Sequence, residues 1–337
     1  MRKQKKIWLA LALTVVLLAV TCIGAWYALK GTLHLILRNM FSPTIAMPEE
    51  EWTKGNSYEY LPYSTVSDSD YLHLYVPDNV EKPPLLVLVH GGGFVYNDAH
   101  SRQAQFMYRY FRDHGYACAS VNYRLADEAK YPAALEDVKA SIKFLRYHAE
   151  EYGYDANRIA IWGESAGGYL ATMIALAGEE DFNNVSFIGQ ETATQPVSAE
   201  VSVLLNYYGV MNFERKEADF QALGVPLWLS KLGWMGRSAC EAWLGKTEKE
   251  LTEEEITMLS PKTYMVGQKD LDVYVAHGDV DITVPVLQSE RLKEDLSAYL
   301  GEERVCLDVK KNYRHASDEF YSEESMRKVE AWLKERV

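Results

Sequence analysis

Hydrophobic residues divide this chain into one long apolar stretch near its start and many short ones after it. Residues 7–29 carry no charged side chain over 23 positions, and a helix needs roughly 20 apolar residues to cross a bilayer. Trp8 lies near one end of the stretch, and Trp26 and Tyr27 lie near the other, where amphipathic rings suit the membrane–water interfaces. The pattern predicts a transmembrane signal anchor over residues 7–29.

The later apolar runs are short, and segments with helical periodicity separate most of them. The predicted strands lie near residues 58–66, 71–76, 84–90, 116–122, 158–162, 201–207, 272–277 and 305–310. The predicted helices cover residues 132–151, residues 169–176 and a final segment from about Ser322. Strands that alternate with helices favour a mostly parallel sheet covered on both faces. The fold class is therefore predicted to be α/β.

Two segments depart from this alternation. Residues 179–200 are polar and are predicted to form a loop insertion. Residues 213–258 hold three tryptophans at positions 228, 234 and 243 among scattered glycines. We expect this segment to form a small helical cap, within residues 212–262, that covers the entrance to a binding site. Ordinary packing of these helices on the core is the alternative, and it is favoured for any single tryptophan.

The charges around the apolar stretch predict its orientation. Four basic residues lie within residues 1–6, and two more, Lys30 and Arg38, follow the stretch. Because basic residues stay preferentially in the cytoplasm, the N-terminus is expected inside and the rest of the chain outside. A cleaved signal peptide is the alternative. The expected organisation is a cytoplasmic basic segment (1–6), an anchor (7–29), a juxtamembrane linker (30–57) and a large α/β domain (58–337).

The remainder of the chain is strongly acidic. The net charge is −13, and residues 1–40 hold six basic and no acidic side chains, which leaves −19 for the remainder. Such a domain repels nucleic acid, so no nucleic-acid partner is expected. The four cysteines, Cys22, Cys118, Cys240 and Cys306, show no CxxC or Cys/His spacing. We therefore expect no metal site and no disulfide framework.

A serine motif follows one of the predicted strands. Gly163, Ser165 and Gly167 form a G-x-S-x-G pattern between the apolar run 158–162 and the helical run 169–176. The order of strand, sharp turn and helix is the context of a nucleophile elbow, in which small neighbours make room for a serine on a strained turn. Ser165 is the predicted nucleophile, and the N–H of Ala166 is a candidate oxyanion donor.

An upstream glycine turn adds to this interpretation. Strand-like residues 84–89 lead into His90 and then three glycines at positions 91–93. Esterases use such an HGGG turn to point backbone N–H groups at a developing oxyanion. Gly92 and Gly93 are the predicted oxyanion donors with Ala166. His90 is expected to tie the loop down rather than to act as a base.

A downstream acid and a downstream histidine complete the order that hydrolases of this kind show. The strand near 272–277 runs into a loop with Asp279 and Asp281, and His315 follows the strand near 305–310. The chain order of serine, acid and histidine matches the α/β-hydrolases. His315 is the predicted general base and acid, with an aspartate to orient it. The other seven histidines lack this placement.

These motifs together resemble a known family. The segments 131–139, 154–168 and 277–285, with Ser260-Pro261, are similar to bacterial α/β-hydrolase carboxylesterases. The nearest group is the hormone-sensitive-lipase-like and xylan-acetyl or feruloyl esterase-like enzymes. The resemblance covers residues 58–335 and implies an α/β-hydrolase fold. In the HG-x-x-D pattern of that family, the acid is Asp281 rather than Asp279. The turn before His315 is bulkier than the usual GxGH.

The sequence therefore predicts a membrane-anchored serine carboxylesterase that needs no cofactor and acts on a small or polysaccharide-linked ester. A peptidase or amidase on the same fold is one alternative, because the triad does not distinguish leaving groups. A hydrolase fold that only binds a ligand is another, although neither Ser165 nor His315 has been lost. The oligomeric state is left open.

Overall fold

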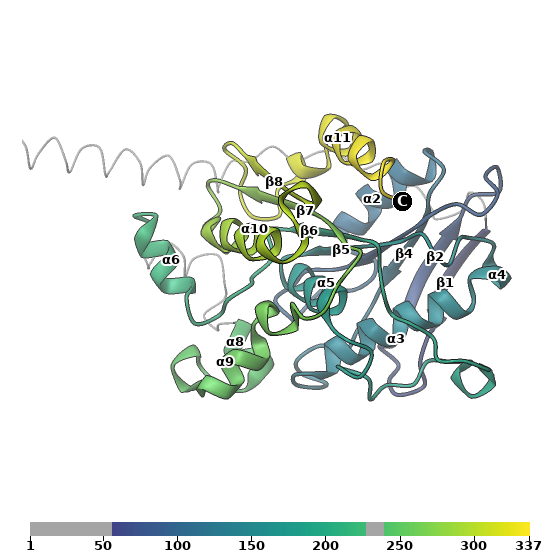
Figure 1. Ribbon diagram of the computed structural model, residues 1–337, viewed down its shortest axis with the longest axis horizontal. Helices are drawn as coiled ribbons and strands as arrows, with labels where there is room; N and C mark the ends of the chain where they lie inside the picture. The colour runs from purple at the N-terminus through teal and green to yellow at the C-terminus, as the bar shows by residue number, and fades with distance from the viewer. Residues whose placement is uncertain (1–55, 227–238) are drawn as a thin grey trace, which may run out of the picture. The chain divides into compact units, whose positions relative to one another are not determined.

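One eight-stranded sheet forms the centre of the domain (Figure 1). The structure, a computed structural model, describes residues 56–226 and 239–337. The strand order is β1-β2-β4-β3-β5-β6-β7-β8. The strands are β1 (Asn56–Pro62), β2 (Tyr71–Val76), β3 (Leu85–Val89), β4 (Ala117–Val121), β5 (Ile159–Glu164), β6 (Val203–Tyr207), β7 (Asp272–Gly278) and β8 (Val305–Lys310). Strand β2 pairs antiparallel with β1 and β4, and all other neighbours are parallel. The predicted mostly parallel α/β sheet is confirmed.

Helices cover both faces of this sheet. The α-helices are α2 (Arg102–Arg112), α3 (Ala133–Tyr147), α4 (Ala149–Tyr152), α5 (Ala166–Leu176), α6 (Lys216–Ala222), α8 (Ala239–Leu244), α9 (Glu253–Leu259), α10 (Leu287–Leu300) and α11 (Glu323–Leu333). Short 3₁₀ turns are η1 (Gln190–Thr192), η2 (Glu248–Glu250), η3 (Pro261–Tyr264), η4 (Glu302–Arg304) and η5 (Asp318–Tyr321). Helices α3, α5 and α10 pack on one face, and α2 and α11 pack on the other (Figure 1).

Alternation along the strands explains these two layers. In β5, Ile159 and Ile161 join the core under α3 and α5, whereas Ala160 and Trp162 join the core under α2 and α11. Successive side chains of a strand point to opposite faces, so a strand that is buried on both faces must be apolar at every position. The continuous apolar runs of the sequence are therefore the central parallel strands.

The observed boundaries correct several predictions. Strand β1 begins at Asn56, inside the predicted linker, and ends at Pro62, where the sequence suggested a strand over 58–66. Beyond it only Ser64 makes an isolated bridge, to Phe187. The single helix expected over 132–151 is divided into α3 and α4 at His148. Helices α2 and α10 were not predicted from the sequence.

The segment expected to form a cap is only partly described. Residues 227–238, with two of its three tryptophans, lie outside the described residues. The third, Trp243 of α8, is fully buried and stacks on Phe94 with ring centroids 4.0 Å apart. Tyr131 and Tyr169 pack edge-on against the same indole. For Trp243 the alternative of ordinary core packing is correct.

The predicted anchor and the cysteines are the remaining features of the sequence analysis. The predicted anchor, residues 7–29, falls outside the described residues. Within residues 56–226 and 239–337, no helix combines the length and apolar character that a membrane crossing requires. Cys118 and Cys306 are free thiols in β4 and β8, as their strand-like surroundings suggested.

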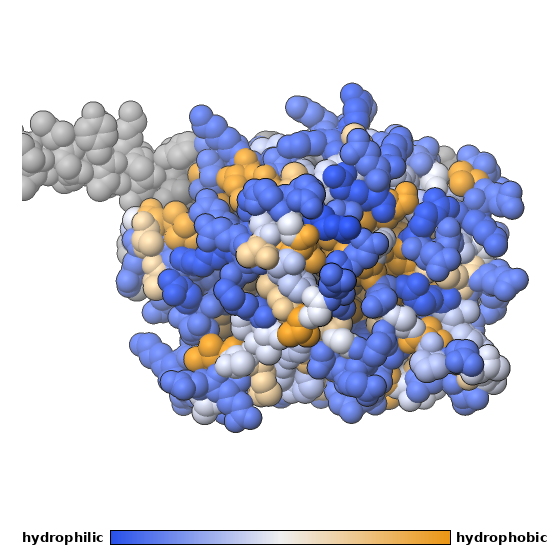
Figure 2. Space-filling view, in the orientation of Figure 1, coloured by the Kyte–Doolittle hydropathy of each residue, from blue (hydrophilic) through white to orange (hydrophobic). Residues whose placement is uncertain are grey.

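The face of the domain seen in Figure 2 is mostly hydrophilic. Hydrophobic residues are scattered among the hydrophilic ones on this face. Exposed apolar side chains include Val66, Val266 and Val309. Single exposed apolar residues of this kind are ordinary for a folded protein.

Candidate active site

The carboxyl ends of the parallel strands bring the predicted site residues to one edge of the sheet. The glycine loop 91–93 follows β3, Ser165 follows β5, and Asp281 and His315 follow β7 and β8. In open α/β sheets, ligands bind outside the carboxyl ends of the strands, where the direction of winding reverses. Here β3 lies between β4 and β5, so this reversal falls beside the glycine loop and the serine.

Ser165 stands on a strained turn between β5 and α5. Its backbone angles, φ 52° and ψ −115°, are rare for a residue with a side chain. A Cβ added to Gly163 would lie 2.1 Å from the carbonyl oxygen of Gly167, and one added to Gly167 would lie 2.1 Å from that of Val89. The backbone N–H of Ser165 donates to Tyr207 O at 2.9 Å. Only glycine fits on either side, so the motif spacing has a steric cause.

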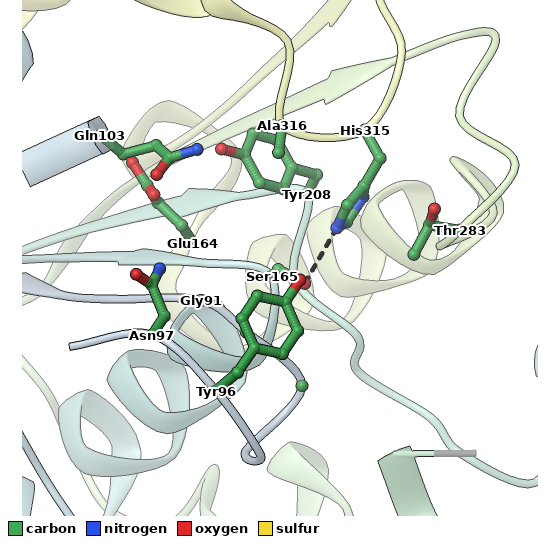
Figure 3. Close-up of a pocket in the computed structure, with 12 residues that line it drawn as sticks. Gly91, Tyr96, Asn97, Gln103, Glu164, Ser165, Tyr208, Thr283, His315 and Ala316 are labelled. Atoms are coloured by element: carbon green, nitrogen blue, oxygen red, sulfur yellow. Dashed lines mark hydrogen bonds between the residues drawn. The ribbon is translucent and has the colours of Figure 1, made fainter. Parts of the chain in front are cut away.

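His315 joins the serine and the acid in one hydrogen-bonded series. Its Nε2 lies 2.9 Å from Ser165 Oγ (Figure 3), and its Nδ1 lies 2.6 Å from Asp281 Oδ2. Because a carboxylate only accepts, Nδ1 carries the proton and Nε2 is left to accept from the serine hydroxyl. This is the tautomer that a general base for Ser165 needs.

Asp281 and Asp279 have different partners. The Asp281 carboxylate contacts His315, whereas the Asp279 carboxylate accepts from the backbone N–H of Asn312. The backbone N–H of Asp279 donates to Lys310 O at 3.1 Å. Asp279 therefore ties its own loop to the turn that carries His315.

Asp281 stays ionised despite its burial, because two imidazoles lie beside it. Oδ1 accepts from the backbone N–H groups of Thr283 and Val284, at 2.7 and 2.8 Å. Burial alone would raise the pKa of this carboxyl, but the adjacent imidazoles of His315 and His277 hold the pKa well below its usual range. His277 lies 3.3 Å from Oδ2 and is itself held by Ser289 Oγ at 2.6 Å. His277 therefore supports the acid from behind.

The glycine loop borders the same pocket as Ser165. Gly92 and Gly93 both line it, and both have positive φ, 119° and 58°. A Cβ on Gly92 would lie 1.9 Å from Tyr96 O, so the loop can close only with glycine there. Ala166 is the first residue of α5, and the first N–H groups of a helix have no partner within it. The three predicted donors thus flank the serine.

His90 holds the start of this loop. Its Nδ1 lies 2.7 Å from Gly91 O, its ring stacks on Tyr123 at 4.3 Å, and the Tyr123 hydroxyl donates to His90 O at 2.9 Å. Burial lowers the pKa of His90 to about 4. The side chain is therefore neutral at physiological pH and lies inside the fold.

Several pocket residues were not predicted from the sequence. Side chains that join the predicted residues in lining the pocket are Tyr96, Asn97, Gln103, Glu164, Tyr208, Thr283 and Ala316 (Figure 3). Tyr208 packs its ring edge-on against His315, with centroids 4.9 Å apart. Its position directly after a predicted parallel strand was the available signal. Among the described residues, no cluster of three or more His, Cys, Asp or Glu could hold a metal ion.

Comparison with known proteins assigns the family. The model of the BD-FAE family matches residues 72–296. The chain belongs to the BD-FAE family. Ser165 and Asp281 lie inside the matched BD-FAE region, and His315 lies beyond it.

Relatives of this BD-FAE chain are named as esterases. LipM of Mycobacterium tuberculosis, described as a probable carboxylic ester hydrolase, is 27% identical over 63% of this chain and 44% of its own length. An acetyl esterase of Salmonella paratyphi B is 34% identical over 34% of each protein. The chain thus spans less than half of either relative.

The fold of this BD-FAE member also matches solved structures. A truncated carbohydrate esterase from gut microbiota superposes with a TM-score of 0.68, at 21% identity, over 85% of this chain and 98% of that one. At this identity the likeness shows the fold, and the α/β-hydrolase fold implied by the sequence resemblance is confirmed.

Proposed function

We propose that this chain is a serine hydrolase that cleaves carboxylic esters through an acyl-enzyme on Ser165. The observation that carries the proposal is the unbroken series from Ser165 Oγ through His315 to Asp281, which opens into a lined pocket. Membership of the BD-FAE family and relatives named as esterases support it.

Each residue has a defined task in the proposed reaction. His315 Nε2 removes the proton of Ser165 Oγ as the oxygen attacks the ester carbonyl, and then gives that proton to the departing alcohol. Asp281 holds the tautomer and stabilises the imidazolium. The N–H groups of Gly92, Gly93 and Ala166 receive the oxyanion. Water then attacks the acyl-enzyme by the same route, with His315 again as base.

The proposed substrate is a small ester or an ester carried on a polysaccharide. The pocket is bordered by polar side chains, among them Asn97, Gln103 and Thr283, which can bond the hydroxyl groups of a sugar. The names of an acetyl esterase and a carbohydrate esterase among the similar proteins support acetylated carbohydrate as the first candidate.

Labelling and paired substrates test this function. A fluorophosphonate should label the wild type and leave Ser165→Ala unlabelled, and Ser165→Ala should lose all but the modest acceleration that an oxyanion hole gives alone. Ser198→Ala, on the loop before β6, is the matched control and should stay active. Esters and p-nitroanilides of the same acyl group, with acetylated xylan, define the leaving group. Undiminished hydrolysis by Ser165→Ala would exclude this nucleophile.

We also propose that the catalytic domain is held outside the cell by residues 7–29. The support is the uncharged stretch and the four basic residues that precede it. The full chain should fractionate with membranes and be cut by protease added to intact cells, and deletion of residues 1–40 should release a soluble, active domain. Soluble enzyme that has lost its first residues would indicate a cleaved signal peptide instead.

A further inference from the structure

Glu164 is a buried acid in the wall of the pocket, and the proposed reaction gives it no task. It precedes Ser165, is 2% exposed, and lines the same pocket. Its Oε1 accepts a hydrogen bond from the hydroxyl of Tyr321 in η5. The Tyr321 hydroxyl lies 2.7 Å from that of Tyr208, whose ring packs against His315. A short chain of hydroxyl groups therefore fixes the Glu164 carboxyl.

Within residues 56–226 and 239–337, no basic side chain acts on the charge of this carboxyl. The titratable groups that face it are Tyr207 and Tyr208 at the end of β6 and Tyr321 of η5. His90, directly after β3, is neutral because burial lowers its pKa to about 4. No residue that lines the pocket within the described parts of the chain is Lys or Arg.

The basic side chain at the start of α2 is paired with an acid of η5. Arg102, at the start of α2, donates to Asp318 of η5 from Nη2 at 2.7 Å. Burial raises the pKa of Glu164 to about 8, and the hydrogen bond from Tyr321 opposes that rise.

We propose that Glu164 keeps its proton while the site works, so that the pocket presents a neutral carboxyl rather than an anion beside the oxyanion site. This inference rests on the proposed function. Figure 3 shows Glu164 grouped with Asn97 and Gln103, across the pocket from His315 and Thr283. An ionised Glu164 would therefore lie on the side away from the imidazolium and oppose the negative charge that the reaction creates. With Tyr321 and Tyr208, it acts as a positioning residue for the reaction.

The consequence is an alkaline limit to the rate. Below the pKa of Glu164 the carboxyl is neutral, and above it the second negative charge raises the barrier. A charge across a pocket of this kind should lower kcat/KM on the order of tenfold. The dependence of kcat/KM on pH reports groups of the free enzyme, so wild type should lose activity as pH rises through about 8.

Two conservative variants test this with different expected results. In Glu164→Gln this side chain is neutral at every pH. The fall of kcat/KM at alkaline pH should therefore disappear, whatever the maximum value of kcat/KM. In Tyr321→Phe the hydrogen bond that favours the ionised carboxyl is lost, so the fall should move to higher pH. Tyr110→Phe removes a Tyr–Glu hydrogen bond of the same kind, to Glu330 at 2.8 Å, and should leave the fall in place. A purely structural role for Glu164 would lower the whole profile without changing its shape.

A second measurement reads the proton directly. Infrared difference spectra of wild type against Glu164→Gln at pH 7 should contain the carbonyl stretch of a protonated carboxyl, and this band should vanish above pH 9. A wild-type spectrum without the band, or an alkaline fall that survives in Glu164→Gln, overturns the inference. If a fluorophosphonate labels neither the wild type nor the variants at any pH, the proposed function fails, and the predicted fall of kcat/KM at alkaline pH fails with it. If both wild type and Glu164→Gln are labelled and their kcat/KM falls at the same alkaline pH, only the inference about Glu164 is refuted.

Discussion

Asp281 and Glu164 are two buried acids of one site, and their surroundings drive them to opposite charge states. Both are almost completely shielded from solvent. Asp281 receives two backbone N–H groups and two imidazoles, and its pKa falls. Glu164 receives one hydrogen bond, from Tyr321, and burial raises its pKa to about 8. Burial alone therefore does not decide the charge of a carboxyl; the number and charge of its donors do.

The largest effect should follow from removing the charge of Asp281. Asp281→Asn keeps the shape of the side chain but no longer selects the tautomer of His315. We expect kcat to fall by about 10⁴, the scale seen when a triad aspartate is lost elsewhere. Steady-state rates with a p-nitrophenyl ester measure this. A loss below tenfold would mean that Asp281 does not orient the histidine.

The next effect is on the stability of the fold. It comes from Glu164, whose pKa is raised where that of Asp281 is lowered. Between pH 4.5, the ordinary value for Glu, and about 8, folded Glu164 holds a proton that the unfolded chain releases, so the wild type loses stability as pH rises. Glu164→Gln does not titrate. The variant should therefore gain on the wild type across this window, by on the order of a few kcal/mol at pH 8. Urea unfolding at pH 4.5 and pH 8 measures the gap.

Glu330 is the matched control for this comparison. Burial would raise the pKa of Glu330, but hydrogen bonds from Lys334 and Tyr110 lower it. Glu330→Gln should therefore lose stability relative to wild type at pH 8 instead of gaining it. If Glu164→Gln and Glu330→Gln change in stability in the same direction at pH 8, the contrast between a carboxyl with a raised pKa and one with a lowered pKa is wrong.

A smaller effect should come from the imidazole behind the acid. His277→Leu has a similar volume but removes the contact with Asp281 and the hydrogen bond with Ser289. The Asp281 carboxylate is then less firmly oriented toward His315, so we expect kcat to fall about tenfold, which corresponds to about 1.4 kcal/mol of the activation barrier. KM should change little, because His277 is not part of the pocket wall. His114→Leu, at a half-exposed histidine near Glu330, should leave kcat unchanged.

The smallest effect belongs to the other acid of the loop. Asp279 accepts from Asn312 and does not contact His315. Asp279→Asn keeps an acceptor for that N–H, so its rate should stay within about threefold of wild type, as for most exposed substitutions. If Asp279→Asn is instead the severe variant and Asp281→Asn the mild one, the assignment of the two acids is reversed.

Chain order and local sterics made much of this site predictable. The apolar runs located the parallel strands, and the glycines around Ser165 located the turn, because both signals depend on neighbours in the sequence. The choice between Asp279 and Asp281 came from a family resemblance. Their different partners in the structure accord with it.

Contacts between segments far apart in the chain could not be predicted from the sequence. Tyr321 lies 157 positions from Glu164, and no local pattern links a 3₁₀ turn near the C-terminus to an elbow in the middle of the chain. The stacking of Trp243 on Phe94 is of the same kind. The helices α2 and α10 were not named, and the end of β1 was misplaced by its mixed exposed and half-buried pattern. Side-chain charge states depend on these long-range contacts, so they needed the folded geometry.

The strained turn at Ser165 has a consequence for protein engineering. A backbone held at φ 52° stores on the order of 1–3 kcal/mol when the residue has a side chain, and glycine would adopt the same angles more readily. Ser165→Gly is thus expected to raise the melting temperature while removing the nucleophile. A library selected for heat resistance alone would drift toward inert proteins at this position, so directed evolution of a thermostable form must screen turnover in every round.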